Sequence, residues 1–383
     1  MFKSKRIKYA IIGVGRMGTV HAHNLYKKRV SNARLAAVCD ISALALDKFA
    51  KKHPGVECYN KHEDLLNCDI DAVIIAVPHY QHLTIARDFI KAKKNIIIEK
   101  PLTVELKDAQ EFCKLKKKYP DLKIAIMYNQ RTNPLYAKAK ELIKSGALGE
   151  IRRSNFIITN WYRPDAYYAN NSWRATYCGE GGGILLNQCV HQLDILTSLL
   201  GTPVNIDSRI STINRSIKTE NDVTAIMEYK NGAICSLSAS GHEQNGICRL
   251  EISGDLGRLV IGKCKMVLYT YATSEIELNL STLSGYGRSK KQAKHYRYGI
   301  LRLIRDSIYG QQIRIIDNFT KSLLNGADLI ADANEGINAL EIINGIYLSS
   351  WCEKKISLPL DNNLFSKMLE GKRNEEKTYI LKR

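Results

Sequence analysis

Hydrophobic residues in the first 130 positions fall into short runs rich in isoleucine and valine, separated by stretches with a helical spacing of apolar positions. The apolar runs cover residues 7–15, 34–40, 71–78, 94–101 and 123–129. The helical stretches cover residues 16–28, 43–53, 80–93 and 105–118. Strands that are apolar throughout are typical of a parallel sheet with helices on both faces. The alternation predicts a doubly wound α/β domain over residues 1–130.

The pattern changes after about residue 150, where predicted strands are joined by short turns instead of helices. Asn231-Gly232 lies between two of them and favours a tight hairpin. One helix, over residues 183–201, interrupts the series and ends at a glycine. We therefore expect an α+β domain with a large, mostly antiparallel open sheet over residues 131–360. Its predicted strands cover residues 151–162, 209–215, 222–230, 233–240, 248–255, 257–262 and 265–271.

The C-terminal part of the chain completes this two-domain organisation. The apolar pattern predicts a helix over residues 332–353, which we expect to pack back on the first domain. Residues 361–383 are expected to form a charged C-terminal tail, which is mobile over residues 372–383.

Composition restricts the class of protein. The chain has 383 residues, which suits two domains, and no apolar run reaches the ~18–20 residues of a transmembrane helix. Its 10 cysteines form no CxxC pair and no spacing typical of a zinc site, and most lie within apolar runs. Such cysteines behave as small buried hydrophobic residues. We therefore expect a reducing compartment, the cytoplasm, and no bound metal.

The formal net charge of +19 arises from lysine-rich runs scattered along predicted helix surfaces and one loop. Nucleic-acid binding would gather these charges on one face with aromatic residues or a known motif, so no nucleic-acid partner is expected. A solvated surface accounts for the charge. Attraction of an anionic substrate, such as a phosphorylated or nucleotide-linked sugar, is the alternative.

A glycine pattern joins the first predicted strand to the first predicted helix. Residues 13–18 read Gly-Val-Gly-Arg-Met-Gly, which in this context is typical of a dinucleotide-binding turn. Gly13 permits the tight turn, Gly15 lets a pyrophosphate approach the backbone, and Gly18 permits close packing of helix on strand. Arg16 and Met17 lie within the same turn. A glycine turn that binds nothing is the alternative.

An acidic residue follows at the position that the dinucleotide pattern requires. Asp40 ends the second predicted strand and is followed by Ile41 and Ser42, with no arginine to receive a 2′-phosphate. A carboxylate there accepts hydrogen bonds from the adenosine ribose and repels a 2′-phosphate. The sequence therefore predicts NAD as cofactor, with NADP disfavoured, and includes Ile41 in the site.

Further polar groups follow later strands of the first domain. Glu99-Lys100-Pro101 comes directly after a buried strand, where a lysine beside the cofactor can orient or deprotonate an alcohol. Val77, Pro78 and His82 follow the preceding strand and are expected to border the cofactor. A helix-cap or packing role is the alternative for His82.

The predicted helix over 183–201 carries a polar stripe and is preceded by three glycines, which suggest close approach of the backbone to a ligand. Asn187, His191 and Asp194 are spaced i, i+4 and i, i+7 and share one face. Burying these groups without a purpose would be costly. The apolar side chains on the other faces supply packing: Leu186, Val190, Leu193 and Leu196. A hydrogen-bonded structural histidine is the alternative for His191.

Taken together, the glycine turn, Asp40, Glu99-Lys100-Pro101 and the G-G-G-x-L-L-N-x-x-x-H-x-x-D run resemble the glucose–fructose oxidoreductase/inositol dehydrogenase (Gfo/Idh/MocA) family over nearly the whole chain. The resemblance implies a Rossmann domain, and an NAD-dependent dehydrogenase of sugars or cyclitols in which Lys100 and His191 flank the reacting hydroxyl. Inositol dehydrogenases of the family carry Asp where this chain has Asn187. Whether Lys100 or His191 takes the proton is therefore open.

The segment from Asn160 to Gly183 resembles a branch of the family that acts on hexopyranosides, some members at the C3 hydroxyl, or on inositols. In this reading Asn187 and His191 meet the substrate and Asp194 orients the site. Further candidates for lining the sugar pocket are Tyr128, Arg131, Tyr162, Arg163, Trp173 and Arg174. The family also implies a homodimer or homotetramer, with the strands between 209 and 271 at the interface.

Two other functions fit the same motifs. One is a glycosidase that holds NAD tightly and oxidises its sugar only transiently. The other is a non-catalytic sensor of sugar or NAD on the same fold. The presence of Lys100 and His191 favours an enzyme, because a protein that only binds has no need of a poised base.

Overall fold

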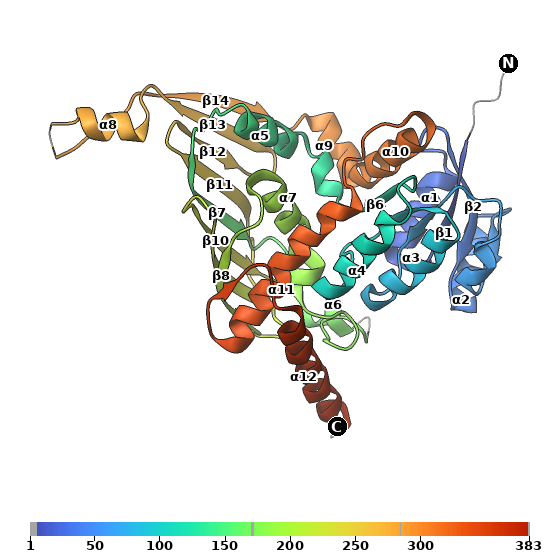
Figure 1. The fold of residues 1–383 in the computed structure, drawn as a ribbon. Helices are drawn as coiled ribbons and strands as arrows, with labels where there is room; N and C mark the ends of the chain where they lie inside the picture. The colour runs from blue at the N-terminus through green and yellow to red at the C-terminus, as the bar shows by residue number, and fades with distance from the viewer. Residues whose placement is uncertain (1–5, 170–171, 284, 382–383) are drawn as a thin grey trace, which may run out of the picture. The chain divides into compact units, whose positions relative to one another are not determined.

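The computed structural model describes residues 6–169, 172–283 and 285–381, and the chain divides into two compact units (Figure 1). Unit 1 comprises Met1–Thr132, Gly179–Gly181 and Arg305–Leu340. Unit 2 comprises Asn133–Cys178, Gly182–Ile304 and Glu341–Arg383. The first five residues, and the last two of the expected tail, lie outside the described part.

Unit 1 is built on a parallel sheet. Its described residues form six strands in the order β3-β2-β1-β4-β5-β6, with each neighbouring pair parallel. The strands are β1 (Ile7–Ile12), β2 (Ala33–Cys39), β3 (Glu57–Tyr59), β4 (Ala72–Ile75), β5 (Asn95–Ile98) and β6 (Ile124–Ile126). Helices alternate with them: α1 (Arg16–Tyr26), α2 (Ala43–Lys52), α3 (His82–Lys91) and α4 (Leu106–Lys117). The predicted doubly wound domain is confirmed.

A helix from late in the chain completes the core of unit 1. Helix α10 (Gly310–Asn325) places Phe319 against Tyr9 of β1, with ring centroids 6.5 Å apart. The Tyr9 hydroxyl lies 2.8 Å from Thr320 Oγ1, and burial raises the pKa of Tyr9 above its ordinary value. The Asn129 amide donates to Gln311 Oε1 at 2.8 Å. Segments 182 to 311 residues apart in sequence therefore form one core.

Unit 2 is built on a mixed but mostly antiparallel sheet. In the described residues it has nine strands in the order β14-β13-β12-β11-β7-β10-β9-β8-β15, and β7 pairs with β10 in parallel. The strands are β7 (Ile151–Ile158), β8 (Asn205–Ser211), β9 (Asp222–Glu228), β10 (Ile234–Ser240), β11 (Cys248–Gly254), β12 (Gly257–Ile261), β13 (Lys265–Tyr271), β14 (Lys291–Arg297) and β15 (Ile356–Ser357). The predicted large open sheet is confirmed.

One face of this sheet is buried and the other is not. Along β9 and β10, Val223, Met227 and Leu237 are buried, whereas Thr224 and Ile226 are exposed. This alternation is typical of an antiparallel sheet with one covered face. The α-helices that lie wholly within the described part of unit 2 are α5 (Pro134–Lys144), α6 (Asp165–Ala169), α7 (Val190–Leu200), α8 (Glu275–Ser281) and α12 (Asn362–Leu381) (Figure 1).

Two helices run from one unit into the other, α9 (Ile300–Ser307) and α11 (Gly336–Cys352). Helix α11 corresponds to the helix predicted over 332–353. Its first residues belong to unit 1, where a Cβ at Gly336 would lie 2.0 Å from Ile126 Cδ1. The remainder belongs to unit 2.

From Asn362 onward, the described residues of the expected charged tail form helix α12, which the sequence pattern does not predict. Although this segment is rich in charge, it has a short apolar stripe that includes the buried residues Phe365 and Leu369. Glu376 is also buried, and accepts hydrogen bonds from the backbone N–H groups of Tyr177 and Cys178. Contacts with distant residues therefore stabilise a helix that the composition of the segment does not indicate.

Two further findings concern membrane-spanning helices and the cysteines. None of the described helices combines the length and the apolar character that crossing a membrane requires. All 10 cysteines are free, and Cys39, Cys189 and Cys235 are buried.

Candidate functional site

The glycine turn of unit 1 has the geometry of a dinucleotide site. Gly13 has φ +89°, and a Cβ there would lie 2.5 Å from the Ala76 carbonyl oxygen. A Cβ at Gly18 would lie 1.7 Å from the Gly13 oxygen, so α1 packs directly on the turn. Gly15 caps α1 and has no atom within 4 Å of an added Cβ. The first amides of α1 therefore adjoin open space, which suits a phosphate group.

Asp40, the residue predicted to bind the adenosine ribose, lies beside the glycine turn. It follows β2, and its two carboxylate oxygens accept hydrogen bonds from Val14 N at 2.8 Å and Ser42 N at 2.9 Å. The first of these bonds ties the carboxylate to the glycine turn. The following residue, Ile41, is 89% exposed. Each oxygen retains acceptor capacity for a ribose hydroxyl. The residues present thus fit NAD.

A buried histidine connects the loops that follow β4 and β5. His82 Nδ1 lies 2.8 Å from the Pro101 carbonyl oxygen, and Nε2 lies 2.9 Å from that of Val77. Burial lowers the pKa of His82, against the opposing effect of these backbone oxygens. Because a neutral ring carries one N–H, it donates to one of the two at a time. His82 positions the loops that carry Val77, Pro78 and Lys100, and its contact with the cofactor stays a prediction.

The acidic residue beside Lys100 is held by a histidine that no motif points to. His21 of α1 is fully buried, and its Nε2 lies 2.6 Å from Glu99 Oε1. Glu99 Oε2 accepts from the backbone N–H of Lys100 at 3.2 Å. The helix that follows the glycine turn thus supports the Glu99-Lys100 segment. The one sequence signal for His21 is its position three residues after Gly18, on the face packed against the sheet.

In unit 2 the predicted polar helix begins with a wide turn. Residues Leu185–Cys189 form a π-helical turn that continues into α7. Such turns occur frequently at functional sites. Asn187 and His191 are half-buried, whereas Asp194 is fully buried. The residues predicted to supply packing are indeed in the core: Leu186, Val190, Leu193 and Leu196.

Arginines and aromatic rings gather next to this turn. The guanidinium groups of Arg163 and Arg174 lie 4.7 Å and 4.9 Å from the ring centre of Tyr167. The Tyr167 hydroxyl accepts hydrogen bonds from Arg174 Nη1 at 2.6 Å and from the Gln188 amide at 3.2 Å. Trp173 lies against Arg174, at 5.0 Å. Three predicted substrate residues are thereby connected, through Tyr167, to the turn that carries Asn187.

Three further candidates for the sugar pocket make other contacts. Tyr162 is 45% exposed and stacks against the guanidinium of Arg215. In unit 1, Tyr128 is buried and Arg131 forms an ion pair with Glu335. These contacts suit packing, and a substrate role for Tyr128 and Arg131 stays a prediction.

The two candidate proton acceptors belong to different units. Lys100 follows β5 in unit 1, and His191 lies on α7 in unit 2. Each is half-buried. Lys100 does follow a strand, and His191 does lie on a mostly apolar helix, and the roles assigned to both stay predictions.

Two protein-family models match this chain over separate parts of its length. Residues 7–125 match the family model of an oxidoreductase family with an NAD-binding Rossmann fold, and residues 136–260 match that of the GFO/IDH/MocA C-terminal domain. Myo-inositol 2-dehydrogenase of Thermotoga maritima is 25% identical over 367 residues, which cover 93% of this chain and 99% of that protein. The scyllo-inositol 2-dehydrogenase (NAD(+)) of Bacillus subtilis is 28% identical over 269 residues, covering 67% of this chain and 74% of that protein.

Solved structures share the fold. The WlbA dehydrogenase of Bordetella pertussis, solved in complex with NADH and UDP-GlcNAcA, has a TM-score of 0.76 at 21% identity. The match covers 93% of this chain and 100% of that chain. The two matching family models, one over each half of the fold, agree with the dinucleotide turn and the open sheet. The chain belongs to the Gfo/Idh/MocA family of NAD-dependent oxidoreductases.

Proposed function

We propose that this protein oxidises a secondary hydroxyl of a sugar or cyclitol, a hexopyranoside or an inositol, with NAD. The observation that carries the proposal is the pair of half-buried polar residues, Asn187 and His191, on a helical segment whose other side chains from residue 184 to residue 197 are buried. The adjoining Arg163, Trp173 and Arg174 are the residue types that bind polyols. The inositol dehydrogenases named above, related over most of the chain, support the same substrate class.

The first unit would hold the cofactor. The α1 amides that follow Gly15 would bind the pyrophosphate, and Asp40 would accept hydrogen bonds from the adenosine ribose. Val77 and Pro78 would border the nicotinamide. When bound, NAD supplies the acceptor for the hydride that leaves the carbinol carbon.

The chain's own residues would manage the hydroxyl proton. Loss of hydride from the carbon requires loss of the proton from its oxygen, so a base must lie within about 3 Å of that oxygen. Lys100 and His191 are the residues we assign to this step. Asn187 has no basic group; its amide would position the substrate by hydrogen bonds. The buried Asp194 would orient the helix from inside unit 2.

The test is a screen of purified protein with NAD against inositols, hexoses, glycosides and nucleotide sugars, read as NADH absorbance. We expect NADH to form with at least one polyol. Cleavage of a glycoside without net NADH would instead indicate a glycosidase that oxidises its substrate transiently. Binding measured by thermal shift, with neither reaction, would indicate a sensor.

The choice of NAD over NADP can be tested at Asp40. Asp40→Ala should raise the KM for NAD and reduce the discrimination against NADP, because the variant loses both the ribose acceptor and the repulsion of a 2′-phosphate. Steady-state kinetics with both cofactors would measure this. A wild-type protein that prefers NADP would contradict the assignment.

We also propose that the exposed face of the unit 2 sheet pairs with another copy of the chain, giving a homodimer or homotetramer. Ile226, at 49% exposure, lies on this face beside Thr224 and Ser238. Light scattering at micromolar concentration should show the oligomer, and Ile226→Lys should weaken it because a charge would be buried. A monomeric wild-type protein would contradict the proposal.

A further inference from the structure

Glu220, a buried carboxylate outside every sequence motif, contacts the start of the segment that carries Asn187. It lies just before β9 and is 2% exposed. Its Oε2 accepts a hydrogen bond from Gly183 N, and its Oε1 one from Leu185 N, each at 3.0 Å. Its backbone oxygen accepts from Ile184 N at 3.3 Å. One residue therefore fixes three consecutive amides where the helical segment begins.

Tyr347 of α11 completes the arrangement. Its hydroxyl donates to Glu220 Oε1 at 2.8 Å and accepts from Gly183 N at 3.1 Å. A Cβ at Gly182 would lie 2.1 Å from this hydroxyl, and a Cβ at Gly183 would lie 2.0 Å from the Glu220 backbone oxygen. Close packing against Glu220 and Tyr347 thus explains why Gly182 and Gly183 are glycines, and no bound ligand is needed to explain them.

The anchored residues lead directly into the candidate site. Asn187 N donates to the Gly183 carbonyl at 3.2 Å, and the π-helical turn Leu185–Cys189 continues into α7 and His191. A π-helical turn is rare and lacks the usual hydrogen-bond register, and contacts from outside the helix stabilise its start here. Glu220 and Tyr347 are such contacts.

We propose that Glu220, supported by Tyr347, is a positioning residue for the oxidation: it holds the wide turn so that Asn187 and His191 are presented to the substrate. The inference rests on the proposed function. A displacement of about 1 Å at a reacting group is enough to lower a rate on the order of 10²-fold. Glu220 therefore acts through the helix and does not itself touch substrate.

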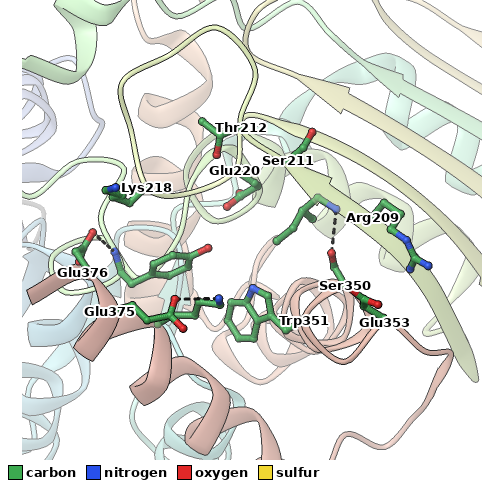
Figure 2. A pocket seen from close by; sticks show the side chains of 13 residues that line it. Arg209, Ser211, Thr212, Lys218, Glu220, Ser350, Trp351, Glu353, Glu375 and Glu376 are labelled. Atoms are coloured by element: carbon green, nitrogen blue, oxygen red, sulfur yellow. Dashed lines mark hydrogen bonds and ion pairs between the residues drawn. The ribbon is translucent and has the colours of Figure 1, made fainter. Parts of the chain in front are cut away.

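The ionised carboxylate is the form suited to this task, because it can accept from the Gly183 and Leu185 amides and from the Tyr347 hydroxyl together. Burial raises the pKa of Glu220 to about 7, although its hydrogen bonds lower it. Glu220 also lines a cavity of about 570 Å³ in unit 2 (Figure 2). The titratable and charged groups that face it are Tyr168, Tyr177, Cys189 and Tyr347, together with the cavity residues Arg209, Lys218, Glu353, Lys372, Glu375 and Glu376.

The first experiment compares Glu220→Gln with Glu376→Gln. Both carboxylates are buried on the same cavity and accept two backbone N–H bonds, but those of Glu376 come from Tyr177 and Cys178, away from the wide turn. Glu220→Gln keeps the size and points an amide N–H at a donor. We expect it to lower kcat by about 10–100-fold with an unchanged Kd for NAD. Glu376→Gln should leave kcat within about twofold. Equal kcat in Glu220→Gln and wild type would overturn the proposal.

A second variant keeps the proposal testable if Glu220→Gln does not fold. Tyr347→Phe removes a hydrogen bond that lowers the pKa of Glu220. In Tyr347→Phe the acid limb of the pH profile of kcat should therefore move to higher pH. In Glu376→Gln the limb should stay where it is, because that carboxylate accepts from the amides of Tyr177 and Cys178 instead. An acid limb of Tyr347→Phe at the wild-type pH, or an equal shift in Glu376→Gln, would assign the limb to another group and refute the role of Glu220.

Hydrogen exchange of the amides of residues 183–189 separates this inference from the proposed function, because it needs no substrate. We expect faster exchange of these amides in Glu220→Gln than in wild type and in Glu376→Gln. If no polyol yields NADH in wild type while this result holds, the proposed function fails and the anchoring stands. If wild type is active but exchange and kcat are unchanged in Glu220→Gln, the inference alone fails.

Discussion

Replacing Lys100 or His191 by alanine should lower kcat by about 10²–10⁴-fold, the usual effect of losing a general acid–base group. Lys100 follows β5, whose residues Ile96–Ile98 are fully buried, so its position is set by a rigid strand. His191 follows the wide turn of unit 2. Both residues are assigned to the proton of the reacting hydroxyl, and Asn187, in place of the aspartate that inositol dehydrogenases carry, offers His191 no negative charge. We therefore expect both substitutions to matter.

Matched controls exist for each. Lys94 lies at the opposite end of β5 and donates to the carbonyl oxygens of Cys68 and Ile70, and His242 is a half-buried histidine of unit 2 paired with Asp222. Lys94→Ala and His242→Ala should leave kcat within about twofold. Calorimetric Kd values for NAD should be unchanged in His191→Ala. A variant of Lys100 or His191 with near-native kcat on the true substrate would remove that residue from the mechanism.

The glycine turn gives the second large expected effect, and here two neighbouring glycines should behave differently. Gly18→Ala would place a Cβ 1.7 Å from the Gly13 backbone oxygen, which cannot move without displacing α1. We expect a loss of about 1–3 kcal/mol in the free energy of unfolding, as for other overpacked sites, together with weaker NAD binding. Gly15→Ala meets no atom within 4 Å. Its stability should stay near that of wild type while its Kd for NAD rises, because the added methyl group occupies the approach of the pyrophosphate.

Thermal unfolding and NAD titration of the two variants measure these effects. Each kcal/mol corresponds to roughly 2–4 °C in Tm for domains of this size. Normal NAD affinity in Gly15→Ala would show that no dinucleotide phosphate approaches this turn. A Tm for Gly18→Ala equal to that of wild type would show that α1 does not pack on Gly13 as described.

The sequence predicted those parts of the fold that depend on local pattern. Strand β4 and residues Ile96–Ile98 of β5 are apolar and buried, and the short apolar runs in the sequence indicate this directly. The glycine turn and Asp40 were found because they belong to one short stretch of chain. Helix α12 was missed because its charges obscure the few buried apolar positions, such as Phe365 and Leu369. Its order depends on contacts with distant segments, which no local pattern records.

The same distinction applies to the site. His21 and Glu99 are 78 positions apart, and Gly183 and Glu220 are 37 positions apart, so neither pair forms a motif. In sequence, Glu220 is one carboxylate among many acidic residues. Only folding shows that it is buried and has backbone amides as partners. Predicting such residues requires the three-dimensional neighbours of the motif, which the order of residues does not supply.

The discontinuous composition of unit 1 has a consequence for biosynthesis. Its sheet is encoded by the first 132 residues, but α10, which covers Tyr9, is encoded by residues 310–325. At a synthesis rate of about 5–20 residues per second, the ribosome needs about 10–40 s to produce the intervening chain. During that interval the nascent Rossmann sheet exposes the surface that Phe319 later covers. Chaperone capture of nascent chains should therefore concentrate on this interval.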